Sequence, residues 1–105
     1  MFGIQIQARV NDENRHEFLQ ACKVLAQLCG KNSCCVAQAL YQDTFNPNVF
    51  LWSEQWNDHD SLKTHMQTAG YRSLLGAIEI LGELDFIRMV EFRQPTEKGT
   101  GHPIA

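Results

Sequence analysis

The spacing of apolar residues changes between two periods along the chain, and the order of these periods constrains the fold more than any other feature. Residues 2–10 alternate apolar and polar side chains, which predicts a β-strand. Apolar residues then recur at helical spacing, which predicts a helix over residues 13–29. Asn11 or Asp12 is the expected cap, and Gly30 the expected left-handed stop.

The middle of the chain predicts a β-hairpin. Residues 34–42 are rich in side chains that suit a strand, and residues 49–56 form a third strand with alternating faces. Residues 43–48 lie between them and consist of Asp, Thr, Phe, Asn, Pro and Asn, a composition typical of a turn. A short turn joins antiparallel neighbours, so we expect these two strands to pair.

A second helix and a last strand complete the predicted order. Asp58 or Asp60 caps the helix, which is interrupted near Gly70 and ends before Gly82. Residues 84–93 follow as the last strand. The sequence therefore predicts the order β-α-β-β-α-β.

This order is the split βαβ arrangement of ferredoxin-like α+β proteins, in which two helices cover one face of a four-stranded antiparallel sheet. We predict one such domain over residues 1–93, because a chain of 105 residues buries enough surface to fold without disulfides or metal. Residues 94–105 contain two Pro, two Gly and few apolar side chains. They predict a flexible C-terminal tail or an arm over a partner subunit.

Both faces of the predicted sheet carry apolar side chains. Phe50, Trp52 and Trp56 fall on one face of the third strand, and Val49 and Leu51 fall on the other. Two helices cannot cover both faces, and an uncovered apolar face is larger than soluble monomers usually expose. A second copy packing sheet to sheet about a twofold axis is the simplest cover, so we expect a homodimer.

Charge and composition exclude several classes of partner. The formal net charge is −3, and the nine Lys and Arg residues are scattered, so we expect no nucleic acid partner. No apolar run approaches the roughly 20 residues of a membrane span, and the N-terminus has no charged region followed by an apolar core. These features predict a cytoplasmic protein without a membrane partner.

The four cysteines do not have the spacing of a zinc site, because paired knuckles and a Cys/His set are absent from the sequence. Cys22, Cys29, Cys34 and Cys35 are expected to be reduced, small apolar residues of the core. Motifs for nucleotides, heme attachment and a nucleophile elbow are also missing. We therefore expect no cofactor and no metal.

Glu54 and Trp56 are the first candidates for chemistry. Glu54 shares a strand face with aromatic residues and would be costly to ionise there without a partner. Arg88 on the last strand is a possible partner, giving an ion pair within the sheet, and the alternative is a carboxylate tuned as an acid or base. Trp56 is either a core anchor or a pocket wall.

His65 borders the apolar stripe of the second helix and could point over the sheet. One interpretation is a half-buried surface group. The other is a general base near neutral pH, able to remove a proton from a phenol or an activated carbon. The remaining histidines, which are His16, His59 and His102, are expected in solvent or in the tail.

A cluster of residues in the second half of the chain carries a family resemblance: Glu54-Gln55-Trp56, then Leu62, His65, Gln67-Thr68 and Tyr71. This run resembles the signature of the antibiotic biosynthesis monooxygenase family, especially its quinol monooxygenase branch, and the likeness extends over most of residues 3–93. The resemblance implies a dimeric α/β barrel. In many members, quinols, anthrones or related phenolic compounds are oxidised by O2 without metal or flavin.

The resemblance also implies roles for five residues. His65 is the base or hydrogen-bonding partner, with Trp56 beside it as the second catalytic residue. Trp52 and Tyr71 line the substrate site, and Glu54 orients a neighbour. The alternative is a non-oxidative protein of the same fold, either an isomerase of small phosphorylated ketoses or a ligand-binding module. An isomerase needs a phosphate site, for which the sequence offers isolated cations, namely Arg9, Lys63, Arg72 and Arg88.

Overall fold

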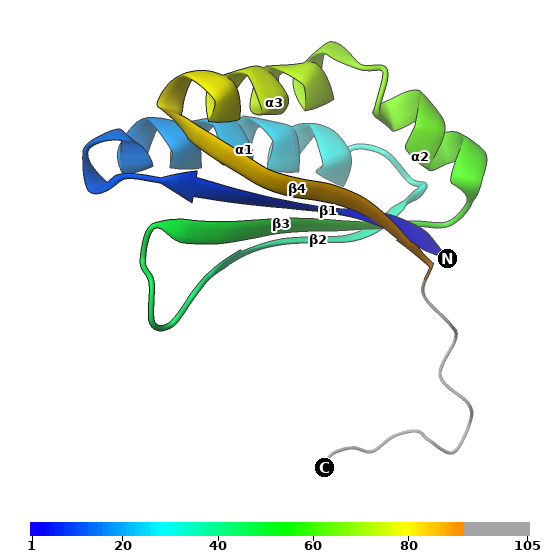
Figure 1. Ribbon diagram of the computed structural model, residues 1–105. Coiled ribbons are helices and arrows are strands. Elements are labelled where there is room, and N and C mark those ends of the chain that lie inside the picture. The colour runs from blue at the N-terminus through cyan, green and yellow to red at the C-terminus, as the bar shows by residue number, and fades with distance from the viewer. Residues whose placement is uncertain (92–105) are drawn as a thin grey trace.

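Helices cover one face of a four-stranded antiparallel sheet in the computed structural model, which describes residues 1–91 (Figure 1). The elements in chain order are β1 (Phe2–Val10), a 3₁₀ turn (Asp12–Asn14), α1 (Arg15–Gly30), β2 (Cys35–Gln42), β3 (Val49–Trp56), α2 (His59–His65), α3 (Ala69–Leu81) and β4 (Gly82–Glu91). The expected α+β, ferredoxin-like fold is confirmed. The sheet order is β2-β3-β1-β4.

The predicted hairpin of β2 and β3 is confirmed, and its turn is held by short polar side chains. The Asp43 carboxylate accepts the backbone N–H groups of Phe45 and Asn46 at 3.0 and 2.8 Å. Asn46 in turn accepts the N–H of Asn48 at 3.1 Å. These bonds satisfy the turn locally, as the composition of residues 43–48 indicates.

The face of the sheet under the helices forms the core. Alternate residues of β1 and β3 point to this face, so period-two spacing delivers their apolar side chains to one layer. The buried apolar residues of the described chain are Ile4, Ile6, Ala8, Val10, Phe18, Cys22, Leu25, Cys29, Phe50, Trp52, Trp56, Leu62, Tyr71, Leu74 and Ile78. Removing this surface from water is the main stabilising contribution to the fold.

The end of α1 differs from the expectation. Gly30 is the last helical residue and does not adopt a left-handed conformation, so the predicted glycine stop is wrong. Lys31, with φ of −89°, ends the helix instead, and its N–H donates to the carbonyls of Leu28 and Cys29. A right-handed turn closes the helix without positive φ, so glycine is not required there.

The predicted interruption of the second helix near Gly70 is confirmed. It lies at residues 66–68, between α2 and α3. Asp58 caps α2 as expected, accepting the N–H of Ser61 at 2.8 Å. The helix ends at His65, and Thr68 caps α3 by accepting the N–H of Tyr71. The break therefore places His65 at the end of one helix and Tyr71 in the first turn of the next.

The last strand begins at Gly82, directly after α3, two residues earlier than predicted. A Cβ at residue 82 would collide with the backbone carbonyl oxygen of Arg9, so glycine permits the close approach of β4 to β1. Residues 92–93 of the predicted strand and the predicted tail at 94–105 lie outside the described residues. Within residues 1–91, the helices are too short or too polar to cross a membrane.

Candidate functional site

A buried carboxylate on β3 is the centre of the candidate site. Glu54 is 0% exposed, and its two oxygens accept one indole N–H each. Trp52 Nε1 donates to Oε2 at 2.7 Å, and Trp56 Nε1 donates to Oε1 at 2.9 Å. The three residues occupy alternate positions of one strand and so point to the same face. The strand alone thus builds two of the contacts of the carboxylate.

His65 adds an imidazole from the end of α2. Its Nε2 lies 2.9 Å from Oε1 and 3.1 Å from Oε2 of Glu54, and its side chain is only 6% exposed. The ring stacks on Trp56 with centroids 4.6 Å apart and an interplanar angle of 31°. Tyr71 meets the ring edge-on at 5.6 Å. The carboxylate and two aromatic side chains therefore fix the orientation of the imidazole.

The environment keeps Glu54 ionised. Burial acts to raise the pKa of the carboxyl, but hydrogen bonding and charge from His65 oppose it, and the two indole donors add to this effect. The net result is that the pKa of Glu54 lies below its ordinary value. The site therefore combines a buried anion with an imidazole that shares its proton.

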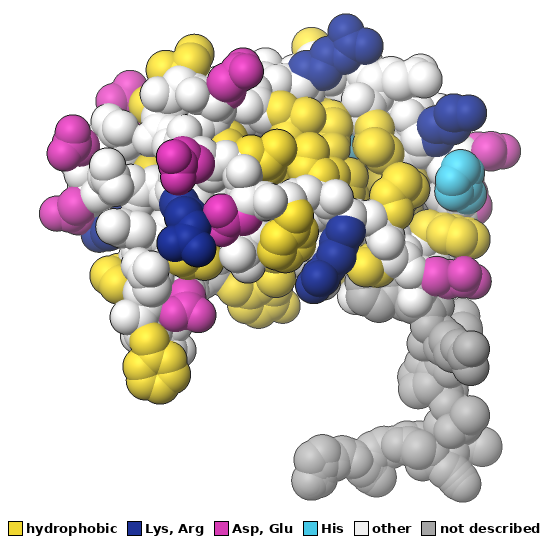
Figure 2. Space-filling model, viewed as in Figure 1, with side chains coloured by type: hydrophobic (Ala, Val, Ile, Leu, Met, Phe, Trp, Pro, Cys, Tyr) yellow, Lys and Arg dark blue, Asp and Glu magenta, His cyan; other side chains and the backbone are white. Residues whose placement is uncertain are grey.

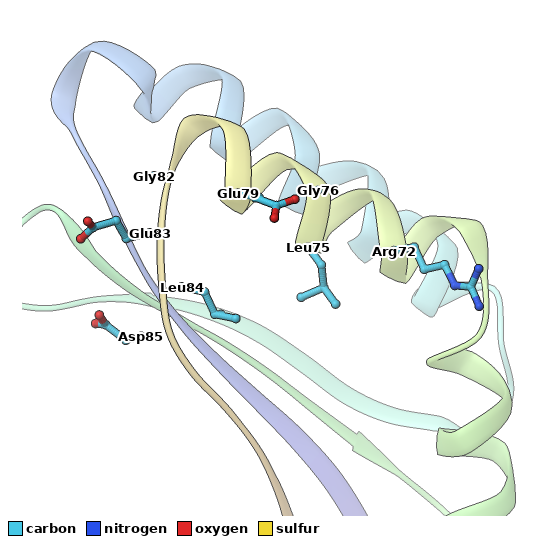
Figure 3. Close-up of a pocket in the computed structure, with 8 residues that line it drawn as sticks. All are labelled: Arg72, Leu75, Gly76, Glu79, Gly82, Glu83, Leu84 and Asp85. Atoms are coloured by element: carbon cyan, nitrogen blue, oxygen red, sulfur yellow. The ribbon is translucent and has the colours of Figure 1, made fainter.

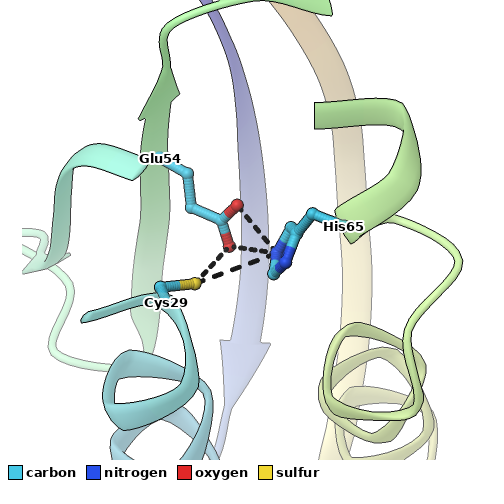
Figure 4. A group of neighbouring side chains, drawn as sticks. All are labelled: Cys29, Glu54 and His65. Atoms are coloured by element: carbon cyan, nitrogen blue, oxygen red, sulfur yellow. Dashed lines mark hydrogen bonds and ion pairs between the residues drawn. The ribbon is translucent and has the colours of Figure 1, made fainter. Parts of the chain in front are cut away.

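Cys29 brings a thiol from the last turn of α1 to the same place (Figure 4). Its Sγ is 3.7 Å from Glu54 Oε2 and 3.9 Å from His65 Nε2. Burial raises the pKa of the Cys29 thiol, and the negative charge of Glu54 raises it further, so the thiol is protonated. Cys29, Glu54 and His65 together offer sulfur, oxygen and nitrogen ligand atoms within 4.8 Å of one another.

The structure brings together all five residues that the sequence singled out, which are Trp52, Glu54, Trp56, His65 and Tyr71. The expected pairing of Glu54 with Arg88 is wrong. In the antiparallel register Arg88 lies beside Gln5, whereas Glu54 lies beside Ile4, so the two side chains leave the sheet on opposite faces. Arg88 instead donates to Gln5 at 2.8 Å and lies over the ring of Phe86.

Cys29 also belongs to this cluster, although the sequence predicts it only as a residue of the core. The available signal was the helical stripe of α1, whose inward members are Phe18, Cys22, Leu25 and Cys29. This stripe shows that Cys29 faces the sheet. It does not show which strand residue the thiol meets, because that depends on how α1 packs.

Two cavities lie between the helices and the sheet, and one of them reaches the cluster through Trp52. A groove of about 870 Å³ separates α3 from β4, with Leu75 and Leu84 extending into it (Figure 3). Hydrophobic side chains gather between these elements, where Leu84 is 47% exposed (Figure 2). The second cavity, of about 400 Å³ between α1 and β2, is lined in part by Trp52. His65 and Trp56 belong to neither lining.

Three of the four cations considered for a phosphate site do not converge. Arg9 forms an ion pair with Asp85 at 3.0 Å, and Arg88 lies on the open face of the sheet. Arg72 lines the groove between α3 and β4, where Glu79 and Glu83 are its neighbours in the lining. These positions give the phosphorylated-ketose alternative no common anion site.

The chain resembles proteins of one family in sequence. The family model described as "Antibiotic biosynthesis monooxygenase" matches residues 1–75. A curated relative, "Putative monooxygenase YcnE" of Bacillus subtilis (strain 168), is 27% identical over 90 residues. That match covers 84% of this chain and 95% of the relative.

Solved structures share the fold. A "putative antibiotic biosynthesis monooxygenase" from Deinococcus radiodurans superposes with a TM-score of 0.80 at 21% identity, covering 90% of this chain and 94% of that one. A variant of SnoaB, described as a cofactor-independent oxygenase from Streptomyces nogalater, gives a TM-score of 0.76 at 17% identity, covering 90% and 95%. At these identities the likeness establishes the fold alone.

Proposed function

The chain belongs to the antibiotic biosynthesis monooxygenase family, and we propose that it is a cofactor-independent monooxygenase that oxidises a small quinol, anthrone or related phenolic compound with O2. The observation that carries the proposal is the buried pair of Glu54 and His65. An ionised carboxylate only accepts hydrogen bonds, so Nε2 of His65 carries the shared proton. In the neutral ring Nδ1 is then the basic nitrogen, held in one orientation.

In the proposed reaction the protein has two tasks, which are to remove a proton from the substrate and to exclude water. His65 Nδ1 takes a proton from the substrate, which leaves an electron-rich anion that reacts with O2. At a CH2 carbon between aromatic rings, O2 forms a hydroperoxide, which loses water to give a carbonyl. One oxygen atom of O2 ends in the carbonyl and the other in the water. The Glu54 carboxylate stabilises the imidazolium formed in the first step.

Aromatic side chains around His65 suit a flat phenolic substrate. Trp56 packs on the imidazole and Tyr71 meets its edge, so the imidazole lies among aromatic side chains that suit contact with a flat ring. The cluster is closed in this structure, and we propose that α2 moves to admit the substrate. This helix has seven residues, too few for independent stability, and is anchored through Leu62, His65 and its Asp58 cap.

We further propose that the protein is a homodimer in which the open faces of two sheets pack together. This face carries Leu51, Phe86 and Val90, all half-buried, and Tyr41, which is 58% exposed. The helices lie on the other face of the sheet (Figure 1), so no helix within residues 1–91 covers these side chains. Light scattering after gel filtration is expected to give twice the mass of 12.0 kDa, and a monomer would refute the proposal.

An oxygen electrode tests the activity directly. We expect O2 uptake with at least one member of a panel of quinols and anthrones by protein freed of metal with a chelator. In His65→Gln the amide can still donate to Glu54 but cannot act as a base, so kcat is expected to fall by about 10²–10⁴-fold. His59→Gln is the matched control, because His59 lies at the other end of α2 and is exposed.

Two results would count against these assignments. No O2 uptake with any compound of the panel removes the proposed activity. Uptake that survives in His65→Gln at the level of His59→Gln removes His65 from the reaction, provided that circular dichroism shows both variants folded.

A further inference from the structure

The cluster of Cys29, Glu54 and His65 combines the three donor types that zinc prefers. Thiolate, imidazole and carboxylate are all common zinc ligands. The three side chains come from the end of α1, the middle of β3 and the end of α2, so three separate elements converge on one point (Figure 4). We propose that this cluster binds a Zn²⁺ ion.

The distances between the donor atoms are close to those of a tetrahedral site. Usual zinc bond lengths place two tetrahedral ligand atoms about 3.4–3.6 Å apart. Here Sγ of Cys29 is 3.7 Å from Glu54 Oε2 and 3.9 Å from His65 Nε2, and that nitrogen is 3.1 Å from the same Glu54 oxygen. A shift of about half an ångström in each pair suffices to bind the ion.

Neighbouring groups already orient the ligands. The indoles of Trp52 and Trp56 donate to Glu54 and fix its carboxylate, which is the role that outer hydrogen bonds play in zinc sites. The three donor atoms of Cys29, Glu54 and His65 therefore form the protein part of the site.

Binding is charge-balanced when three ligands are considered. Zn²⁺ displaces the thiol proton of Cys29 to solvent, and the proton on His65 Nε2 moves to Nδ1. The ion, one thiolate, one carboxylate and a neutral imidazole then sum to zero. A buried cluster without net charge is favourable, because no ion in it is left uncompensated.

The inference goes beyond the proposed oxygenase activity and has a consequence for it. A zinc-bound His65 carries its proton on Nδ1, the atom that the proposed reaction uses as a base. Zinc is therefore expected to inhibit turnover, and a chelator to restore it. This inhibition rests on the proposed function, whereas the binding of zinc does not.

Binding is measured on the full chain after removal of metal. CoCl2 is titrated as the spectroscopic probe, and one equivalent is expected to produce a thiolate-to-cobalt charge-transfer band that ZnCl2 then abolishes. In Cys29→Ala the band is expected to disappear and zinc affinity to fall by at least about 100-fold. Cys22→Ala is the matched control, since Cys22 is buried on the same face of α1 outside the cluster, and its affinity stays within about twofold.

Cys29→Ser serves as a second variant, because it preserves the volume of the side chain while replacing sulfur by a poor ligand. It is expected to lose the charge-transfer band as Cys29→Ala does. Less than one equivalent bound by the native chain at saturation would overturn the proposal. So would a charge-transfer band that persists in both Cys29 variants, because the thiolate would then come from elsewhere.

Discussion

Replacing Glu54 by Gln tests the buried cluster most directly, because the two side chains have the same shape but different hydrogen-bonding capacity. The carboxylate accepts the indole N–H of Trp52 on one oxygen and that of Trp56 on the other. Glutamine has one acceptor oxygen and one NH2 group, so one indole must face a donor. The substitution therefore leaves at least one buried N–H without an acceptor.

The magnitude follows from the groups involved. An unpaired buried donor costs about 1–3 kcal/mol, and exchanging the charged partner of His65 for a neutral amide costs about 1 kcal/mol more. We expect Glu54→Gln to lower the free energy of unfolding by about 2–4 kcal/mol at pH 7. With a usual m-value, this lowers the urea midpoint by about 1–2 M.

The effect has a defined pH dependence. The pKa of Glu54 is lowered in the folded state, so the carboxylate contributes stability that is complete above its unfolded pKa of about 4.3. This contribution is lost as the pH falls through that value toward the folded pKa. The difference in unfolding free energy between the native chain and Glu54→Gln is therefore expected to narrow as the pH falls below about 5.

Urea unfolding followed by tryptophan fluorescence, repeated over this pH range, measures the difference. Glu83→Gln is the control, because Glu83 is exposed on β4, and it is expected to change stability by less than about 0.5 kcal/mol. A difference below about 0.5 kcal/mol for Glu54→Gln at pH 7 would refute the hydrogen-bonding argument. A difference that stays constant on acidification would refute the electrostatic argument.

Three further stability changes follow from the same geometry, each measured by urea unfolding. Asp58→Ala removes the N-cap of α2 and is expected to cost about 1 kcal/mol; no change would show that the cap bond is unimportant. Gly82→Ala drives a Cβ into the carbonyl of Arg9 and is expected to cost more than about 2 kcal/mol, whereas Gly76→Ala, in open space on α3, should stabilise by about 0.5–1 kcal/mol. Equal effects at the two glycines would contradict this reasoning. Trp56→Phe keeps a ring but removes one donor to Glu54, and is expected to cost about 1–2 kcal/mol, with an unchanged midpoint as the contradicting result.

The order of elements could be predicted from the sequence because each element carries its own period. The bounds of β1 and β3 agree with the alternation of their side chains, and Asp58 marks the start of α2. The left-handed stop at Gly30 was wrong because glycine permits, but does not require, positive φ. The sequence pattern around Gly30 cannot distinguish a glycine with positive φ from one with helical φ.

The candidate site could be predicted in part for the same reason. Trp52, Glu54 and Trp56 share a strand face, so their proximity follows from spacing alone. The partner of Glu54 could not be predicted from spacing, because contacts between different elements depend on strand register and helix packing. Arg88 and Glu54 lie on opposite faces, and His65 and Cys29 approach from two helices whose placement the sequence pattern does not specify.

The carboxylate at the centre of β3 also has a consequence for folding. Sliding β3 by one residue against β1 would turn Glu54 to the opposite face of the sheet and take it away from His65 and Cys29. An apolar residue at this position would tolerate such an error at moderate cost. With a carboxylate, the buried His65 donor loses its acceptor, whereas Trp52 and Trp56 turn together with Glu54 because they lie on the same strand. Glu54 therefore makes the native register of β3 against β1 more favourable than a register shifted by one residue.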